Sequence, residues 1–169
     1  MKIAIIDYGA GNIQSIKFAI KRLGYDAVLT DDAAEIKAAD KVIFPGVGEA
    51  SSAMKMLKST GLDTVIPKLT QPVLGICLGM QLMCEYCEEG DTTGLSIFDA
   101  KVVRFDNSVK VPQIGWNQIY DLQSDLFEGV NEKEYVYLVH SFYVKECEET
   151  ICSTEYGVEY TSAIKKNNF

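Results

Sequence analysis

The chain has 169 residues, of which 47% are hydrophobic and 24% charged, a composition that fits one compact domain with a sizeable core. Its 16 lysines and arginines are outnumbered by 24 aspartates and glutamates, and the net charge of −8 argues against a nucleic-acid-binding protein, which needs a basic face. No apolar run reaches the roughly 20 residues of a membrane-spanning helix, and the charged Asp7 follows Met1 too closely for a signal peptide. We therefore expect a cytoplasmic protein with neither a membrane nor a nucleic-acid partner.

The first half of the chain alternates short apolar runs with helical patterns. Strands are predicted over residues 2–7, 26–29, 41–44 and 73–76. Between them, helices are predicted from the Asn12 cap to Gly24, over residues 31–39, through Ala53 and Leu57 to Gly61, over residues 62–69, and from Leu78 onward. This alternation is typical of βαβ units and predicts an α/β fold with a parallel sheet.

The second half is richer in β-branched and aromatic residues separated by polar turns. It predicts antiparallel or mixed strands over residues 100–105, 118–120, 134–145, 150–156 and 159–165, and at most one helical turn at 124–127. Residues 165–168 are typical of a hairpin turn, with Phe169 at the start of a returning strand. No linker or repeat divides the chain, so residues 1–169 are expected to form a single domain.

The strongest local motif is Gly75-Ile76-Cys77-Leu78-Gly79, placed between a predicted strand and a predicted helix. It has the form of a nucleophile elbow with Cys in place of Ser, and the small flanking residues allow the chain to fold back sharply. The following helix would point its N–H groups at the sulfur, favouring the thiolate, and the Leu78 N–H would bind an oxyanion. The alternative is a buried cysteine between glycines that serve packing alone.

Two glycine-rich turns follow other predicted strands. Residues 45–48, Pro-Gly-Val-Gly, could complete an oxyanion hole beside Cys77 or could form a plain turn. Gly9 and Gly11 suggest a dinucleotide fingerprint, but the third glycine is replaced by Gln14 and the fingerprint fails.

The five cysteines and one histidine leave several alternatives open. An odd number of cysteines favours free thiols, and a zinc site built on Cys84 and Cys87 with Cys147 and Cys152 has loose spacing. His140 could serve Cys77 as a general base, although a lone histidine in an aromatic strand is more often a hydrogen-bonded structural residue.

Four segments together, residues 7–12, 44–48, 75–82 and 115–117, resemble the class I (triad-type) glutamine amidotransferases. Within that family, the sequence is similar to the glutaminase subunits of imidazole glycerol phosphate synthase over nearly its whole length. The resemblance implies a flavodoxin-like fold, an open mixed and mainly parallel sheet with helices on both faces and antiparallel strands in the C-terminal half.

The resemblance also implies residue roles. Cys77 would attack the side-chain amide of L-glutamine, forming a thioester and releasing ammonia, and Gly48 and Leu78 would supply oxyanion N–H groups. The residues implied to bind glutamine are Gly46, Val47, Gln81, Ser141 and Phe142. A (β/α)8-barrel cyclase subunit of imidazole glycerol phosphate synthase is the implied partner, and the residues facing it would be Gly11, Asn12, Trp116, Asn117 and Tyr137. No cofactor and no metal are implied.

The sequence departs from the family pattern at one place. The family's general base and its orienting carboxylate come from a His-Pro-Glu segment, and no such segment occurs here. We therefore expect a C-terminally incomplete amidotransferase domain with at most residual glutaminase activity, while His140 matches the family's other histidine, in the glutamine-binding strand. Two alternatives stay open: an amidotransferase subunit serving another acceptor synthase, and a non-catalytic partner-binding module of the same fold.

Overall fold

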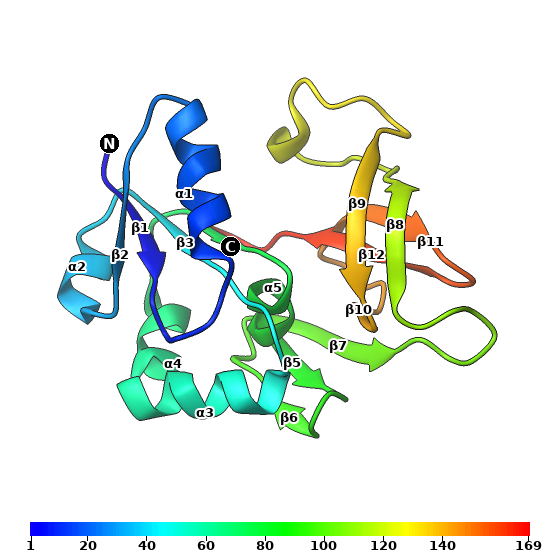
Figure 1. Cartoon of the computed structure of the whole chain (residues 1–169), viewed down its shortest axis with the longest axis horizontal. Helices are drawn as coiled ribbons and strands as arrows, with labels where there is room; N and C mark the ends of the chain where they lie inside the picture. Colours follow the sequence, from blue (N-terminus) through cyan, green and yellow to red (C-terminus); the bar gives the residue numbers. More distant parts are fainter.

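The first half of the chain forms a parallel sheet, described with the rest of residues Met1–Phe169 by a computed structural model (Figure 1). Its strands are β1 (Ile3–Ile6), β2 (Ala27–Thr30), β3 (Lys41–Phe44) and β4 (Val73–Gly75), in the order β2-β1-β3-β4. The predicted strands are confirmed to within one residue at each end. In a sheet of this order, ligands bind at the carboxyl ends of the strands, near the point where the order reverses.

Helices cover both faces of this sheet, as the fold prediction requires. The helical elements are α1 (Ile13–Arg22), α2 (Ala33–Lys37), α3 (Ala50–Thr60), α4 (Leu62–Val65), the 3-10 helix η1 (Ile66–Lys68) and α5 (Leu78–Met83). Ile3 and Ile5 of β1 pack against Ile20 of α1, whereas the alternate residues Ala4 and Ile6 join the main core under the other helices. The period of two along β1 thus places successive side chains on opposite faces.

The predicted helix boundaries rest on local capping. Asn12 accepts a hydrogen bond from the Ser15 N–H at 3.4 Å at the start of α1, as predicted. Gly61 ends α3 with a φ of +73°, a conformation that glycine adopts at little cost.

The second half forms a six-stranded mixed sheet in the order β11-β12-β10-β7-β5-β6. Its strands are β5 (Cys84–Cys87), β6 (Thr92–Thr93), β7 (Phe98–Arg104), β10 (Phe142–Val144), β11 (Thr150–Glu155) and β12 (Glu159–Ile164). The β5–β7 pair is parallel and the other pairs are antiparallel, which confirms the mixed character predicted for this half. The residue 124–127 turn is the 3-10 helix η2 (Asp125–Phe127).

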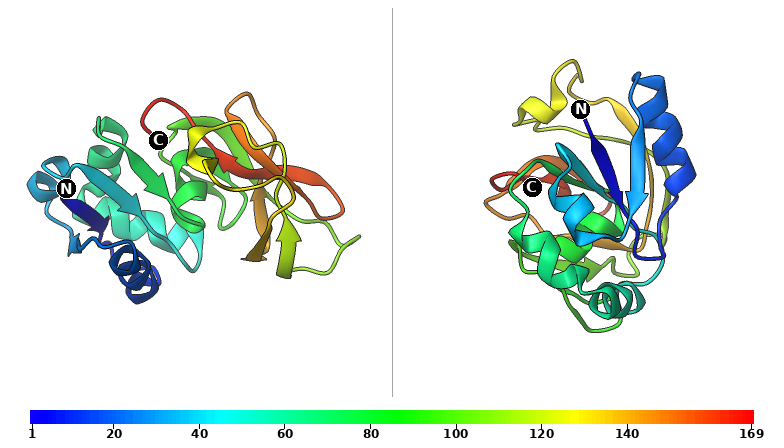
Figure 2. Two further views of the ribbon diagram at one scale, coloured as in Figure 1. Left: turned by 90° about the horizontal axis from the view of Figure 1, so that it is seen from above. Right: turned by 90° about the vertical axis from the view of Figure 1, so that its left-hand side faces the viewer.

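A separate antiparallel pair, β8 (Gln113–Gln118) and β9 (Tyr135–His140), stands apart from both sheets. The pair projects from the same side of the molecule as α1 (Figure 2). We call its outward side the hairpin face. The outward side carries Ile114 and Trp116 of β8 opposite Val139 and Tyr137 of β9.

Two predictions for the second half were wrong in position. The strand expected at 118–120 lies earlier, as β8, because pairing with β9 outweighs the poor strand propensity of Gly115. The run expected over 134–145 breaks at Ser141, where β9 pairs with β8 and β10 pairs with β7. The helix predicted from Leu78 is confirmed and ends after Met83, whereas the β5 and β6 strands that follow it were not predicted.

The predicted turn at 165–168 is present and lies beside β4. The backbone groups of Lys166 and Phe169 exchange two hydrogen bonds of 3.0 Å, and Val73 donates to the Asn168 carbonyl at 2.8 Å. The main core contains Phe98, Val102, Val144 and Ile164 as well as residues of the parallel sheet. None of the helices has the length and apolar character needed to cross a membrane.

Candidate active site

Three loops meet at the carboxyl ends of β1, β3 and β4, which are adjacent in the parallel sheet. The Tyr8 hydroxyl, after β1, donates a buried hydrogen bond of 2.9 Å to the carbonyl of Pro45, after β3. The Ile76 N–H, after β4, donates to the Phe44 carbonyl at 3.0 Å. These bonds bring the Pro45–Gly48 turn beside Cys77, as the sequence predicted.

Cys77 occupies the strained turn expected of a nucleophile elbow. Its φ of +55° and ψ of −115° lie outside the regions that residues with a Cβ ordinarily adopt, and its side chain remains solvent-accessible. Such strain persists only where the surrounding structure enforces it, and here the end of β4 and the start of α5 provide that constraint.

Glycine is required on both sides of Cys77 by close packing. A Cβ on Gly75 would lie 2.9 Å from the Met80 Cα, and a Cβ on Gly79 would overlap the carbonyl oxygen of Phe44. Gly46, in the turn after β3, is equally confined, since its Cβ would lie 2.7 Å from the Gly79 nitrogen and 2.8 Å from the Tyr8 hydroxyl. The two glycine-containing motifs therefore interlock, and each leaves room for the other.

Two backbone N–H groups in the loops at this edge of the sheet have no backbone hydrogen-bond partner. The Leu78 N–H belongs to the first turn of α5, and the Gly48 N–H lies in the turn after β3, where Gly48 has a φ of +98°. Unpaired N–H groups from two neighbouring strand ends are the components of an oxyanion hole.

The protonation state of Cys77 differs from the sequence expectation. Burial raises the pKa of the Cys77 thiol, the Leu78 N–H lowers it, and the negative charge of Glu89 raises it further, for a net increase. The helix N–H favours the thiolate, as predicted, but burial and the charge of Glu89, which the sequence interpretation did not include, outweigh it.

The predicted amino-acid-binding residues lie together on the other side of the site. Gln81 is buried and its Nε2 donates to the Phe142 carbonyl at 3.1 Å. The same carbonyl lies 2.8 Å from Nδ1 of His140, whose Nε2 is 3.2 Å from the Tyr160 hydroxyl. With both ring nitrogens engaged and burial lowering its pKa, His140 is placed as a hydrogen-bonded residue and has no bond to Cys77.

A groove of about 1080 Å³, lined mostly by apolar side chains, runs past these residues. It is bordered by Cys77, Gln81, His140 and Phe142, and it extends along the exposed Leu74 of β4. The cysteines other than Cys77 lie elsewhere as free thiols, and no three histidine, cysteine or acidic side chains are grouped as a metal would require.

The sequence profile of the class-I glutamine amidotransferase family matches residues 4–168. The chain belongs to this family.

Two similar proteins support the assignment of this amidotransferase to its family. It is 54% identical to the imidazole glycerol phosphate synthase subunit HisH of Bacteroides thetaiotaomicron, over all of this chain and 88% of the relative. It is 45% identical to the HisH subunit of Haemophilus influenzae, over all of this chain and 86% of the relative.

Solved structures support the fold. A crystal structure of a glutamine amidotransferase superimposes with a TM-score of 0.70 at 16% identity, covering 91% of this chain and 85% of that one. A glutamine amidotransferase from Thermotoga maritima gives a TM-score of 0.58 at 19% identity, covering 88% of this chain and 64% of that one.

The amidotransferase site contains one acidic residue that the sequence interpretation missed. Glu89, in the loop after β5, accepts a hydrogen bond of 2.9 Å from the Ala50 N–H, two residues beyond Gly48. Burial raises the pKa of its carboxyl, the Ala50 N–H lowers it, and the charge of Glu49 raises it again. An acidic pair after a strand is ordinary in sequence, and only the folded chain brings this carboxylate near Cys77.

The residues expected to face a partner divide into three groups. Trp116 and Tyr137 are 69% and 55% exposed on the hairpin face, with their rings edge to face at 5.6 Å. Asn117 instead turns inward and donates to the Glu155 carbonyl at 2.8 Å. Gly11 and Asn12 lie at the start of α1, where a Cβ on Gly11 would be 3.1 Å from the Cβ of Pro45.

Proposed function

We propose that this amidotransferase hydrolyses L-glutamine to glutamate and ammonia and passes the ammonia to a (β/α)8-barrel cyclase subunit in histidine biosynthesis. The observation that carries the proposal is the strained, accessible Cys77 at the start of α5, with the Leu78 N–H directed at its sulfur and the Pro45–Gly48 turn at the end of the neighbouring strand. The identity of 54% to a HisH subunit favours this acceptor over other synthases.

The chemistry follows from the elbow. The Cys77 thiolate attacks the δ-carbon of glutamine, the carbon–nitrogen bond breaks, and the nitrogen leaves as ammonia after accepting a proton. Water then cleaves the carbon–sulfur bond of the γ-glutamyl thioester, releasing glutamate and restoring the thiol. In both steps the substrate oxygen becomes negative, and each of the Gly48 and Leu78 donors would stabilise it by about 3 kcal/mol.

The amino-acid end of glutamine would lie between the oxyanion turn and β10. In this arrangement Gly46 and Val47 border the side chain of the substrate, and Gln81 with the backbone of Ser141 and Phe142 binds its amino-acid group. Glu89 lies close enough to Cys77 to raise its pKa, and we assign its carboxylate to the α-ammonium group of glutamine, the charge that it would attract.

The substitution Glu89→Gln tests this role. The variant's side-chain amide would still accept the Ala50 N–H, but the loss of negative charge should lower the pKa of Cys77, so iodoacetamide should alkylate Cys77 faster at any pH below that pKa. A glutamine analogue with a chloromethyl ketone in place of the amide should nevertheless require a higher concentration to label the same thiol, by about tenfold. Labelling rates at Cys77, measured by peptide mass spectrometry across pH, report both effects. If the substitution made labelling of Cys77 easier with both reagents, or harder with both, the assignment of Glu89 to the ammonium group would be contradicted.

The general base is the part of the triad that this site does not supply. No side chain hydrogen-bonds the Cys77 sulfur, and both nitrogens of His140, the chain's one histidine, are engaged elsewhere. We therefore propose that residues 1–169 alone bind glutamine and expose a reactive thiol, but hydrolyse glutamine slowly.

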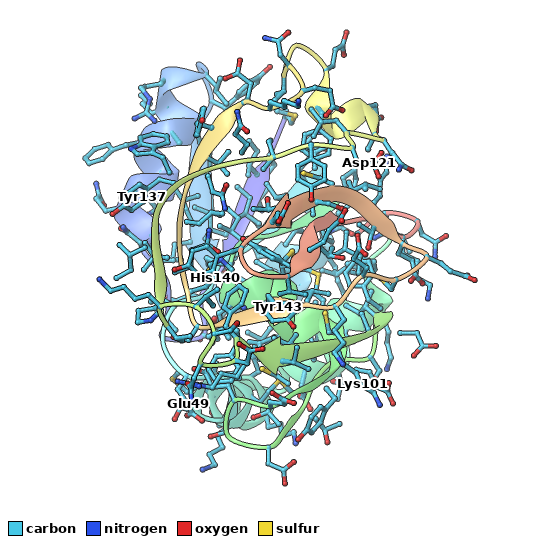
Figure 3. All side chains as sticks on the ribbon, turned by 90° about the vertical axis from the view of Figure 1, so that its right-hand side faces the viewer. Glu49, Lys101, Asp121, Tyr137, His140 and Tyr143 are labelled. Atoms are coloured by element: carbon cyan, nitrogen blue, oxygen red, sulfur yellow. The ribbon has the colours of Figure 1, made fainter.

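The partner would dock on the hairpin face and the α1 start. Both project from one side of the molecule, and Figure 3 shows Tyr137 directed away from the body of the protein while His140 is directed into it. Ile114 and Val139, 59% and 55% exposed, extend the apolar patch beside Trp116. Aromatic side chains surrounded by apolar neighbours are typical of interface hot spots.

Mixing the chain with a barrel cyclase subunit of imidazole glycerol phosphate synthase tests the function and the docking surface together. We expect a one-to-one complex and a faster release of glutamate from glutamine than for the chain alone. Trp116→Ala should weaken the complex by about 30-fold, whereas Leu126→Ala, at an exposed apolar residue outside the hairpin face, should not. A complex that forms but leaves glutamate release at background would favour the non-catalytic partner-binding module.

The single domain and the cytoplasmic location belong to the same proposal. The main core joins residues of both large sheets, which supports one folding unit. The five cysteines are all free thiols, which suits a reducing compartment.

A further inference from the structure

A buried chain of hydrogen bonds leads away from the glutamine site through His140. His140 is the last residue of β9, and its Nδ1 lies 2.8 Å from the carbonyl oxygen of Phe142. Its Nε2, the acceptor nitrogen when Nδ1 carries the proton, lies 3.2 Å from the Tyr160 hydroxyl, whose oxygen is also 2.9 Å from Oε1 of Gln113, so the one hydroxyl hydrogen is shared between two acceptors. Tyr160 and Gln113 are only 2% and 3% exposed, so water does not compete for these bonds.

The Phe142 carbonyl receives two side-chain donors at once. Besides His140, the Nε2 of Gln81 donates to it at 3.1 Å, and Gln81 lies in the helix that begins directly after Cys77. A carbonyl oxygen has two lone pairs, so both are used and the direction of the carbonyl is fixed. Rotation of the Gln81 amide would break its bond to this carbonyl; its Oε1 has no hydrogen-bond partner in the protein, and Gln81 borders the groove.

Aromatic packing holds the imidazole in this orientation. Phe105 is 1% exposed, and its ring lies edge to face with those of His140 and Tyr160, at centroid distances of 5.2 and 5.5 Å. His140 points into this cluster, with Tyr143 nearby (Figure 3). The imidazole therefore has little freedom to leave the Phe142 carbonyl.

We propose that His140 is a positioning residue for glutamine: it fixes the Phe142 carbonyl that orients the Gln81 amide, while Tyr160 and Gln113 lock the imidazole. The inference rests on the proposed function, because the oriented Oε1 of Gln81 acts as an acceptor for the amino-acid end of glutamine. It gives the single histidine a role in substrate binding that is separate from proton transfer.

The test compares two electrophiles at Cys77. The glutamine analogue bearing a chloromethyl ketone forms a carbon–sulfur bond with Cys77 and expels chloride, and its binding requires the residues that hold the amino-acid end of glutamine. Iodoacetamide alkylates the same thiol without needing those residues. Tyr160→Phe removes one hydroxyl and keeps the ring. It should raise the half-saturating analogue concentration about three- to tenfold, with the maximal labelling rate and the iodoacetamide rate near those of the wild type.

Two substitutions at His140 separate positioning from packing. In His140→Asn the side-chain amide can still donate to the Phe142 carbonyl but cannot reach Tyr160, whereas His140→Leu offers no donor. We expect a half-saturating concentration for His140→Asn between those of the wild type and His140→Leu. A purely structural role predicts that both variants lose thermal stability and that labelling by the two electrophiles changes in parallel.

Tyr156→Phe is the matched control. Tyr156 also packs on Phe105, at 5.5 Å, but its hydroxyl donates to the Lys110 carbonyl at 2.8 Å, away from His140. The half-saturating concentration of the glutamine analogue for Tyr156→Phe should equal that for the wild type. If the half-saturating analogue concentrations of both Tyr160→Phe and His140→Leu equal that of the wild type, the inference is overturned. If the analogue labels the wild type no faster than a chloromethyl ketone that lacks the amino-acid end, the proposed function itself is overturned.

Discussion

Cys77→Ser is expected to reduce glutamate release from glutamine, measured with a barrel cyclase subunit, to the background rate without the chain. A serine hydroxyl is a far weaker nucleophile than a thiol unless a base removes its proton, and His140, the one histidine, has both ring nitrogens on partners other than residue 77. The oxyanion N–H groups of Gly48 and Leu78 remain in the variant, so the loss would measure the nucleophile alone. Coupled detection of glutamate gives the rate.

Cys147→Ser is the control for this experiment. Cys147 is the one other cysteine that is not buried, and its sulfur lies 3.7 Å from the Thr150 hydroxyl, in the connection between β10 and β11. Its replacement should leave glutamate release unchanged. Undiminished release by Cys77→Ser would show that Cys77 is not the nucleophile and would remove the basis of the proposed chemistry.

The parts of the site that the sequence predicted correctly are local. The elbow at Cys77 is specified by five consecutive residues, and its backbone strain follows from the turn between β4 and α5. The approach of the Pro45–Gly48 turn to this elbow follows from parallel topology, because adjacent strands present their carboxyl ends at one edge.

The parts that could not be predicted depend on contacts between residues far apart in the chain. Glu89 reaches Ala50 across 39 residues, and Tyr160 reaches Gln113 across 47. The net increase in the Cys77 pKa was missed for the same reason, since burial and Glu89 are effects of the folded chain, whereas the Leu78 N–H, whose lowering effect was predicted, is local. The strand β8 was misplaced because it contains Gly115 and pairs with β9 only across a long connection, although the aromatic and β-branched residues of β9 were themselves predicted as strand.

Gly79→Ala is expected to destabilise the protein by about 3 kcal/mol, at the upper end of the cost of overpacking. The added Cβ would overlap the Phe44 carbonyl oxygen, a backbone atom at the end of a buried strand, so no side-chain rotation relieves the contact. The same displacement would move the Pro45–Gly48 turn away from Cys77, so labelling of Cys77 by the chloromethyl ketone analogue should slow as well. Chemical unfolding in urea and the labelling rate measure the two effects on one preparation.

Gly24→Ala separates crowding from backbone conformation in this experiment. Gly24 has a φ of +83° and no atom within 4 Å of an added Cβ, so its substitution carries only the cost of the left-handed conformation, about 1 kcal/mol. Gly79 lies in α5 and has no such conformational cost, which leaves the overlap with Phe44 as the cause of any larger effect. Equal stabilities for Gly79→Ala and the wild type would mean that the two glycine motifs do not interlock, and the placement of the Gly48 N–H beside Cys77 would lose its structural basis.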